Sequence, residues 1–166
     1  MFLNPVFAGL VKLSVAFLSP PCHTKCSGWF CFAASHILSQ MPYRECPFCN
    51  LPKQRVVLET ETTLAFFDGF PITEGHTLVI PKRHVASIFE LPPELLAALW
   101  QQVAVVRNLL ADLKPDGFNI GVNDGFAAGQ TIMHAHIHVI PRRTGDTTDP
   151  RGGIRWIMPG KAKYWK

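Results

Sequence analysis

Apolar and polar residues alternate in several short stretches of this 166-residue chain. Residues two apart lie on the same face of a β-strand, so alternation of this kind predicts half-buried strands. Alternation predicts strands at residues 118–123 and 131–141, and short apolar runs bounded by polar residues predict strands at 56–60, 64–68 and 76–82. Pro81 fits the end of the third strand rather than its middle, because proline cannot donate a hydrogen bond to a neighbouring strand.

A longer stretch has the period of a helix. Between residues 91 and 115 apolar residues recur every three or four positions, which predicts one amphipathic helix. The apolar stripe consists of Leu96, Leu99, Val103, Val106, Leu110 and Leu113. We interpret this stripe as a core face, and a surface for a partner is the alternative. One long helix among strands with mostly short connections predicts an α+β fold with an antiparallel sheet.

The first 40 residues differ in character from the rest. They contain no acidic residue, and Lys12 and Lys25 are their basic ones. The apolar run at 6–18 is too short to cross a bilayer and lacks the basic start of a signal peptide, so no membrane association is expected. We expect 1–40 to be an accessory or misassigned, poorly ordered extension, and 41–166 to form one domain with a basic C-terminal tail. A weak candidate for a metal site in the extension consists of Cys22, His23, Cys26 and Cys31.

Charge is distributed unevenly along the chain, whose net charge is +4. Residues 142–166 hold seven basic residues against Asp146 and Asp149. Such a tail would attract an anionic ligand, and a merely solvated tail is the alternative. No basic stretch is interleaved with aromatic residues, so a nucleic acid is not an expected partner. The odd number of cysteines, five, and the lack of a convincing secretory signal predict reduced thiols and a cytoplasmic protein.

Three histidines stand at every second position near the end of the chain. The alternation places His134, His136 and His138 on one face of the predicted fifth strand and apolar residues on the other. A polar strand face without a function is the alternative. A neutral imidazole near pH 7 is a good nucleophile and a common metal ligand, so this face is the first candidate for chemistry.

Two cysteines form the motif CPFC at Cys46 and Cys49. Two thiolates at this spacing suit a tetrahedral zinc site, of which they would supply half of the ligands. A pair of core cysteines is one alternative. A redox pair is another, although no βαβ pattern surrounds the motif as such a pair would require.

The stretch NDGFAAGQTIMHAHIHVIPRR, residues 123–143, resembles the signature of the histidine triad (HIT) family. The stretch FFDGFPITEGHTLVIPKRH, residues 66–84, resembles the family's other common segment, and DPRGGIRW, residues 149–156, is similar to bacterial HIT proteins. The loop DGFAAGQT most resembles the Fhit branch and its diadenosine polyphosphate hydrolases. The resemblance covers about 43–157. It implies a HIT-like fold, with a sheet of about five strands, one long helix and shorter flanking helices.

The resemblance also implies a reaction. HIT proteins bind a nucleotide, and the middle histidine of the triad, here His136, attacks the α-phosphorus to form a nucleotidyl-histidine intermediate. A dinucleoside polyphosphate is the expected substrate, and Mg²⁺ would accompany it. The alternatives are a Hint-type phosphoramidase, a nucleotidyltransferase that uses phosphate or another acceptor in place of water, a nucleotide-binding signalling protein without turnover, and a metal-stabilised interaction module. Relatives are commonly homodimers, so we expect a homodimer.

Roles for neighbouring residues follow from the same resemblance. His138 would donate to a phosphate oxygen, and Asp68 would accept hydrogen bonds from ribose hydroxyls. The α-phosphate and the leaving oxygen would be contacted by His76, Asn123, Gln130, Thr131 and the backbone of the glycine loop at 125–129. A turn at Asn123 and a strand-end cap at Asp68 are the alternatives.

Zinc-bearing relatives complete a two-cysteine site with two histidines, one after the IPK strand and one that opens the triad. In this sequence the resulting set is Cys46, Cys49, His84 and His134. Four protein ligands leave no open position on the metal, so the zinc would be structural. His134 would thus brace the catalytic strand while its neighbours take part in the reaction.

Overall fold

The computed structural model describes residues 45–165. The predictions made for 1–40, including the candidate metal ligands Cys22, His23, Cys26 and Cys31, therefore lie outside the described residues. Within the described part no helix is long and apolar enough to span a bilayer.

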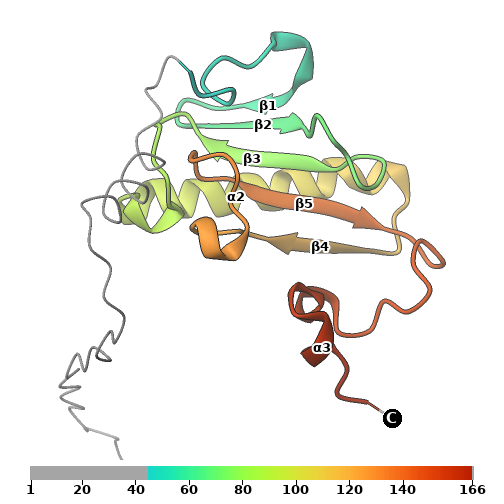
Figure 1. The fold of residues 1–166 in the computed structure, drawn as a ribbon. Coiled ribbons are helices and arrows are strands. Elements are labelled where there is room, and N and C mark those ends of the chain that lie inside the picture. Colours follow the sequence, from blue (N-terminus) through green and yellow to red (C-terminus); the bar gives the residue numbers. More distant parts are fainter. Residues whose placement is uncertain (1–44, 166) are drawn as a thin grey trace, which may run out of the picture. The chain divides into compact units, whose positions relative to one another are not determined.

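A single antiparallel sheet forms the centre of the described residues (Figure 1). Its strands are β1 Val56–Glu59, β2 Thr63–Phe67, β3 Thr77–Pro81, β4 Gly117–Gly121 and β5 Ile137–Arg142. They lie in the order β1-β2-β3-β5-β4, so the last strand in the sequence is inserted between two earlier ones. The predicted α+β class, with five antiparallel strands and one long helix, is confirmed.

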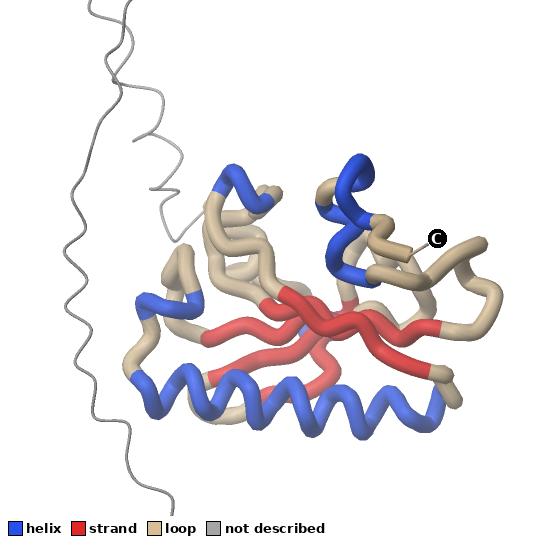
Figure 2. Tube along the Cα trace, turned by 90° about the horizontal axis from the view of Figure 1, so that it is seen from below, coloured by secondary structure: helices blue, strands red, loops and turns tan. Residues whose placement is uncertain are grey.

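The long helix α2, Pro93–Leu109, covers one face of this sheet (Figure 2). It continues into a 3₁₀ turn at Leu110–Leu113. Leu99, Val103, Val106 and Leu110 of the predicted stripe are buried, and Leu96 and Leu113 pack against them. The interpretation of the stripe as a core face is therefore confirmed.

The other face of the sheet carries a second, smaller apolar cluster. Phe66, Leu78 and Ile80 are buried there, and Phe48 packs against them from the segment that contains the two cysteines. The chain after β5 also lies on this face (Figure 2). It contains a 3₁₀ helix at Gly153–Ile157 and the short helix α3, Pro159–Ala162. Further 3₁₀ helices span Lys53–Arg55, Ile88–Glu90 and Phe126–Ala128.

The predicted start of the fifth strand, at residue 131, is wrong, because β5 begins only at Ile137. The register between β3 and β5 ends at the pair Val79 and Ile137. Before that pair other contacts take over: the Ala135 N–H donates to the Val85 carbonyl at 2.7 Å, and His134 Nε2 lies 2.8 Å from the Pro81 carbonyl oxygen. The predicted alternation of faces nevertheless persists, since Ala135 and Ile137 are buried in the core beneath α2.

Candidate active site

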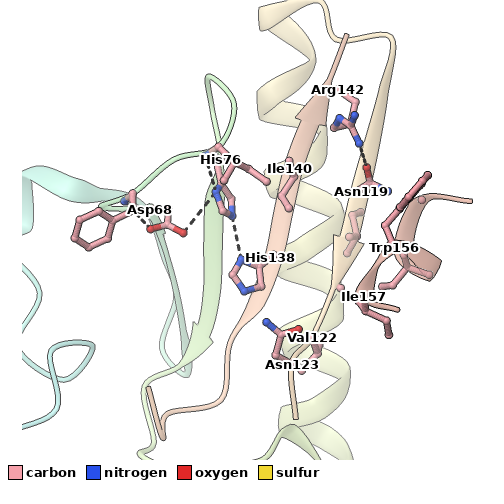
Figure 3. Close-up of a pocket in the computed structure, with 16 residues that line it drawn as sticks. Asp68, His76, Asn119, Val122, Asn123, His138, Ile140, Arg142, Trp156 and Ile157 are labelled. Carbon is pink, nitrogen blue, oxygen red and sulfur yellow. Dashed lines mark hydrogen bonds and ion pairs between the residues drawn. The ribbon is translucent and has the colours of Figure 1, made fainter. Parts of the chain in front are cut away.

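Of the three histidines of the motif, one lies in a strand and two lie in the irregular segment before it. His138 lies within β5, while His134 and His136 lie in the segment just before it. His76 directly precedes β3, which pairs with β5, and so it reaches the same face of the sheet as His138 (Figure 3). The ring centroids of His136 and His138 are 5.0 Å apart, and those of His76 and His138 are 5.2 Å apart.

His136 is held in one tautomer. Its Nδ1 lies 2.7 Å from the backbone carbonyl oxygen of His134, and a carbonyl can only accept, so Nδ1 carries the proton and donates. Nε2 is then left with the lone pair. Burial lowers the pKa of His136 and outweighs the opposite effects of that hydrogen bond and of Asp68. At neutral pH the ring is therefore an uncharged base with a defined nucleophilic nitrogen.

Asp68, His76 and His138 form a chain of polar contacts (Figure 3). His76 Nε2 lies 3.0 Å from His138 Nδ1, and His76 Nδ1 lies 3.5 Å from an Asp68 carboxylate oxygen. The Ile72 N–H also points at His76 Nδ1, at 3.4 Å. The carboxylate requires a proton on that nitrogen, whereas the N–H of Ile72 requires a lone pair. If His76 Nδ1 donates to Asp68, His76 Nε2 accepts from His138 Nδ1, and His138 Nε2 has a lone pair. If His76 Nδ1 accepts from Ile72, His76 Nε2 donates to His138 Nδ1, and His138 Nε2 carries the proton.

Both histidines of this chain, His76 and His138, are uncharged at neutral pH. The pKa of His138 is lowered to about 4, first by burial and then by the neighbouring His136 and His76, against a smaller opposite effect of Asp68. Burial also lowers the pKa of His76, and the Asp68 carboxylate offsets part of this effect. The site is thus a cluster of neutral imidazoles beside one carboxylate, which suits hydrogen bonding to phosphate without a permanent positive charge.

The polar residues around the glycine loop have distinct positions. Gln130 is buried, its carbonyl oxygen accepts from the Gly125 N–H at 2.7 Å, and its amide nitrogen donates to the Ala86 carbonyl at 2.8 Å. Its side chain therefore orders the loop instead of facing open space.

Thr131 lies beside His136 and His138 in one cavity, and Asn123 lies in another. Gly125 and Gly129 have φ values of +87° and +88°, which favour glycine.

Asp68 also acts as a turn residue. One of its carboxylate oxygens accepts the Phe70 N–H at 2.9 Å, which is the strand-end cap considered from the sequence. The other oxygen faces His76. The capping bond fixes the carboxylate, so the structural and the functional interpretations of Asp68 are compatible.

Two cavities meet at the histidines. The first, which we call the nucleophile cavity, has a volume of about 340 Å³ and is lined by Phe48, Arg55, Thr131 and His136 among others. The second, which we call the C-terminal cavity, has a volume of about 530 Å³ and lies between β4, β5 and the 3₁₀ helix at Gly153–Ile157 (Figure 3). Asp68, Phe70 and His138 line both, so one ligand can extend from one cavity into the other.

A compact cluster of sulfur and nitrogen atoms lies at the start of the triad. The ligand atoms of Cys46, Cys49, His84 and His134 all lie within 4.8 Å of one another. His134 Nδ1 lies 3.5 Å from Cys46 Sγ and 3.4 Å from Cys49 Sγ, and His84 Nδ1 lies 3.3 Å from Cys49 Sγ. A tetrahedral zinc ion with ordinary bond lengths separates sulfur and nitrogen ligands by about 3.6 Å. The four residues fit such an ion.

The protonation of this cluster also suits a metal. His134 Nε2 donates to the Pro81 carbonyl, which leaves the lone pair on Nδ1, the nitrogen that faces the cysteines. Burial lowers the pKa of His134 to about 4, so this lone pair is available at neutral pH. Burial and the neighbouring Cys46 raise the pKa of the Cys49 thiol to about 12, and a bound cation would reverse that shift.

The arginines at the end of β5 and beyond it are engaged in contacts of their own. Arg142 binds Asp146 through two nitrogens at 2.7 Å, and Arg151 binds Asp149 at 2.9 Å. Arg143 contacts Glu74 at 3.2 Å and the Leu113 carbonyl at 3.0 Å. These arginines hold the chain in place, so the attraction of anions expected from the charge count is weaker than the count implies.

The residues that form the walls of the two cavities were not predicted from the sequence. Phe48 packs edge-on against His134 and His136, with centroids 6.0 and 5.3 Å away. On the other side Ile154, Trp156 and Ile157 line the C-terminal cavity. The motif DPRGGIRW was visible in the sequence, but a single sequence gives no information on what its side chains face.

Comparison with known proteins agrees with this geometry. The family model described as HIT domain matches residues 51–145. An uncharacterised HIT-like protein of Mycobacterium tuberculosis is 43% identical over 117 residues, which cover 66% of this chain and 79% of that protein. The adenylylsulfatase HINT3 of Arabidopsis thaliana is 37% identical over 107 residues, 61% of this chain, and the match spans 54% of the length of that relative.

Solved structures show the same fold. A zinc-bound histidine triad family protein from Mycobacterium smegmatis matches with a TM-score of 0.60 and 38% identity, over 65% of this chain and 82% of that one. A HIT family protein from Bacillus subtilis matches with a TM-score of 0.58 and 37% identity, over 61% and 76%. The matched segment contains β1 to β5 and the three histidines. The chain belongs to the histidine triad family.

Proposed function

We propose that this protein is a nucleotide-binding hydrolase or nucleotidyltransferase that cleaves a nucleoside phosphate derivative at the α-phosphorus, with His136 as nucleophile. The observation that carries the proposal is the 2.7 Å hydrogen bond from His136 Nδ1 to the His134 carbonyl, which fixes the lone pair on Nε2. Membership of the HIT family supports the same reaction.

The reaction has two displacements. The lone pair of His136 Nε2 forms a bond to the α-phosphorus, and the bond from phosphorus to the leaving oxygen or nitrogen breaks, with its electron pair passing to that atom. A leaving nitrogen also takes a proton from the solvent. Water then forms a bond to phosphorus and loses a proton to the solvent, while the phosphorus–nitrogen bond breaks and returns its electron pair to His136. The product is a nucleoside monophosphate.

The surrounding residues position the phosphorus and stabilise its charge. His138 and Thr131 lie beside His136 in the nucleophile cavity, where an N–H and a hydroxyl can donate to phosphate oxygens. We propose that Asp68 binds the ribose and that His76 contacts the α-phosphate. We also assign Asn123 to the phosphate, which it would approach from the C-terminal cavity that it lines. For Gln130 the structure favours an indirect role, since its amide orders the glycine loop.

We also propose that Cys46, Cys49, His84 and His134 hold one structural zinc ion. The distances within the cluster support this, as does the zinc-bound relative from M. smegmatis. When bound, the ion would tie the cysteine segment to the backbone just before His136 without taking part in a chemical step. Mg²⁺ would enter only with a polyphosphate substrate and stays a prediction from the sequence.

The bond that is cleaved defines the substrate class. The relative called an adenylylsulfatase supports an adenylyl compound as substrate. Dinucleoside polyphosphates remain the proposal from the Fhit-like loop, and nucleoside phosphoramidates are the alternative. A product assay separates them: AMP released mainly from a diadenosine polyphosphate favours the first, and AMP released mainly from adenosine 5′-phosphoramidate favours the second.

The intermediate itself provides the test of mechanism. Wild type, His136→Asn and the surface variant Asp112→Asn are mixed with adenosine 5′-phosphoramidate, quenched in milliseconds and analysed by intact mass. We expect an adenylyl adduct in wild type and in Asp112→Asn, and none in His136→Asn, which should still bind AMP. An adduct or undiminished AMP release in His136→Asn would remove His136 from the nucleophile role.

A homodimer in the cytoplasm completes the proposal. Val105 is 47% exposed on α2, and its apolar side chain offers surface for a second copy. Free Cys46 and Cys49 suit a reducing compartment. Sedimentation equilibrium of wild type and Val105→Asp tests the dimer, which the aspartate should weaken.

A further inference from the structure

A separate cavity, which we call the helix cavity, lies between α2 and the turn that joins β1 to β2. Its volume is about 360 Å³, and small-molecule sites commonly have volumes of about 300–1,000 Å³. The helix α2 covers the face of the sheet opposite to the C-terminal segment (Figure 2). None of the described residues that line the helix cavity lines the nucleophile cavity or the C-terminal cavity, so the proposed function gives it no role.

Gln102 provides this cavity with a buried hydrogen-bond acceptor. The residue lines the cavity and is 3% exposed, and its Nε2 donates to the Leu58 carbonyl at 3.2 Å. A carbonyl can only accept, so the amide nitrogen must face Leu58 and the amide oxygen must be the other atom. That oxygen, Oε1, is buried and has no hydrogen-bond partner among the described residues. A ligand that donates a hydrogen bond to it would remove the cost of an unpaired buried acceptor.

The turn that forms one wall of the cavity is ordered by its own threonines. The hydroxyl oxygens of Thr60 and Thr63 lie 2.7 Å apart, and Thr60 Oγ1 also accepts the Thr63 N–H at 3.0 Å. The Thr60 N–H donates to the Thr63 carbonyl at 3.0 Å, and Thr63 is 1% exposed. The opposite wall belongs to α2, so the fold sets the shape of the cavity before a ligand arrives.

The lining of the cavity indicates the chemistry of a ligand. Leu58, Ala98 and Val105 offer apolar surface, which suits an apolar body. Among the described lining residues Glu61 is the one with a charged side chain, and it is exposed. An anion would meet the Glu61 carboxylate and the Gln102 carbonyl oxygen, which are both acceptors. A cation with N–H donors complements both groups.

We propose that the helix cavity binds a small organic ammonium ion. Its ammonium group donates to Gln102 Oε1, its charge is balanced by Glu61, and its apolar body packs on Leu58 and Ala98. The site is independent of the proposed cleavage by His136, because it shares no residue with the two cavities at the histidines. The ammonium ion and a nucleotide can therefore bind at the same time.

Three probes of similar shape test the charge of the ligand. They are phenethylammonium, the uncharged phenethyl alcohol and the anion hydrocinnamate, and each is titrated into the isotope-labelled full chain and followed by NMR. We expect phenethylammonium to shift the backbone signals of Ala98 and the side-chain amide signals of Gln102, with a Kd on the order of 1 mM. Hydrocinnamate should bind at least about tenfold more weakly. The protein concentration is kept low, because a second copy packed on Val105 would cover the ligand.

A matched pair of glutamates tests the charge of the site. Glu61 and Glu94 are both exposed, but only Glu61 lines the helix cavity. We expect Glu61→Gln to weaken phenethylammonium about threefold, since exposed ion pairs are weak. Glu94→Gln should leave this affinity unchanged, and neither variant should alter the affinity for phenethyl alcohol.

The acceptor is tested by Gln102→Met, which keeps the length of the side chain and removes the oxygen. We expect it to weaken phenethylammonium about tenfold or more, because a hydrogen bond to a charged group is lost. The same change takes a donor from the Leu58 carbonyl, so the amide spectrum of the variant must first show a folded chain. If the variant does not fold, the two glutamate variants still decide.

Several results would overturn the proposal. Unshifted signals of Ala98 and Gln102 would mean that Oε1 is satisfied by water and that the cavity binds no ammonium ion. Shifts confined to the surroundings of Asp68 and His138, and abolished by AMP, would place the probe in the candidate active site instead. Equal affinities for phenethylammonium and hydrocinnamate would contradict the selection by charge. All of these results leave the adduct test of His136 unaffected.

Discussion

At the scale of single residues, His138 shows how position sets charge. Burial beside His136 and His76 lowers its pKa from 6.5 to about 4. Between these two pH values the unfolded chain binds more protons than the folded one, so the free energy of unfolding falls as the pH falls through this window. The stabilisation is complete above pH 6.5 and is lost when the pH reaches about 4.

This gives a prediction for thermal unfolding. We expect the melting temperature of wild type to drop between pH 7 and pH 5, and that of His138→Asn to drop less, by at least about 2 °C. Calorimetry at matched zinc concentration measures both. Parallel curves for the two proteins would mean that His138 keeps an ordinary pKa in the folded state.

Cys46 allows a test of the metal site by a single atom exchange. Its Sγ lies 3.5 Å from His134 Nδ1 in a side chain that is 1% exposed. We expect wild type to contain about one zinc ion per chain, and Cys46→Ser to contain less than about half of that and to melt at a lower temperature. A chelator should destabilise wild type but hardly affect Cys46→Ser. Zinc far below one ion per chain in fresh wild type would contradict the assignment.

Residue types were easier to predict from the sequence than their contacts. The position of Gln130 before the triad was evident, but its amide has three protein partners that lie up to 44 residues away. Whether a buried amide faces a ligand or a carbonyl depends on which groups the fold brings near it. That information is tertiary and is absent from a local motif.

At the scale of elements, α2 was predictable because its apolar residues recur with the period of a helix. Its 3.6-residue stripe follows from local spacing, and the buried residues match that stripe. The start of β5 was not predictable in the same way. The alternation continues from residue 134, but a strand also needs a partner, and the partner strand is in register only from Val79 onwards.

The same helix provides a matched pair of core and surface leucines. Leu99 is fully buried and Leu109 is 48% exposed. We expect Leu99→Ala to lower the free energy of unfolding by about 2–5 kcal/mol, because it leaves a cavity under the sheet. Leu109→Ala should change it by less than about 0.5 kcal/mol. Urea unfolding measures the difference, and equal effects would contradict the packing of α2.

Glycines make a similar pair in the C-terminal element. Gly152 has a φ of +85°, and a β-carbon there would lie 3.1 Å from the Trp165 ring, whereas one at Gly160 would meet nothing within 4 Å. We expect Gly152→Ala to loosen residues 149–165 and to speed exchange of the Arg155 amide proton about tenfold. Gly160→Ala should leave this rate unchanged. Unaltered protection in Gly152→Ala would show that the ring of Trp165 can give way.

At the scale of the whole molecule, the site is assembled from distant parts of the chain. Cys46 and His134 are 88 residues apart in sequence, and the cavity beside His138 is closed by residues 153–157. The sequence predicted that the three histidines lie close together at the start of β5, because a dense motif contains them. The two walls come from opposite ends of the described chain, and no local pattern predicts which face of the sheet they will cover.

The strand order determines when the site can exist during synthesis. β5 is the last strand to leave the ribosome, yet it lies between β3 and β4. Until it is inserted, β3 and β4 each have an open edge that can pair with another chain. The insertion of β5 closes both edges and at the same moment brings His138 beside His76 and His134 beside the two cysteines. An incomplete nascent chain therefore has open strand edges and lacks the assembled histidine cluster, and one folding event ends both conditions.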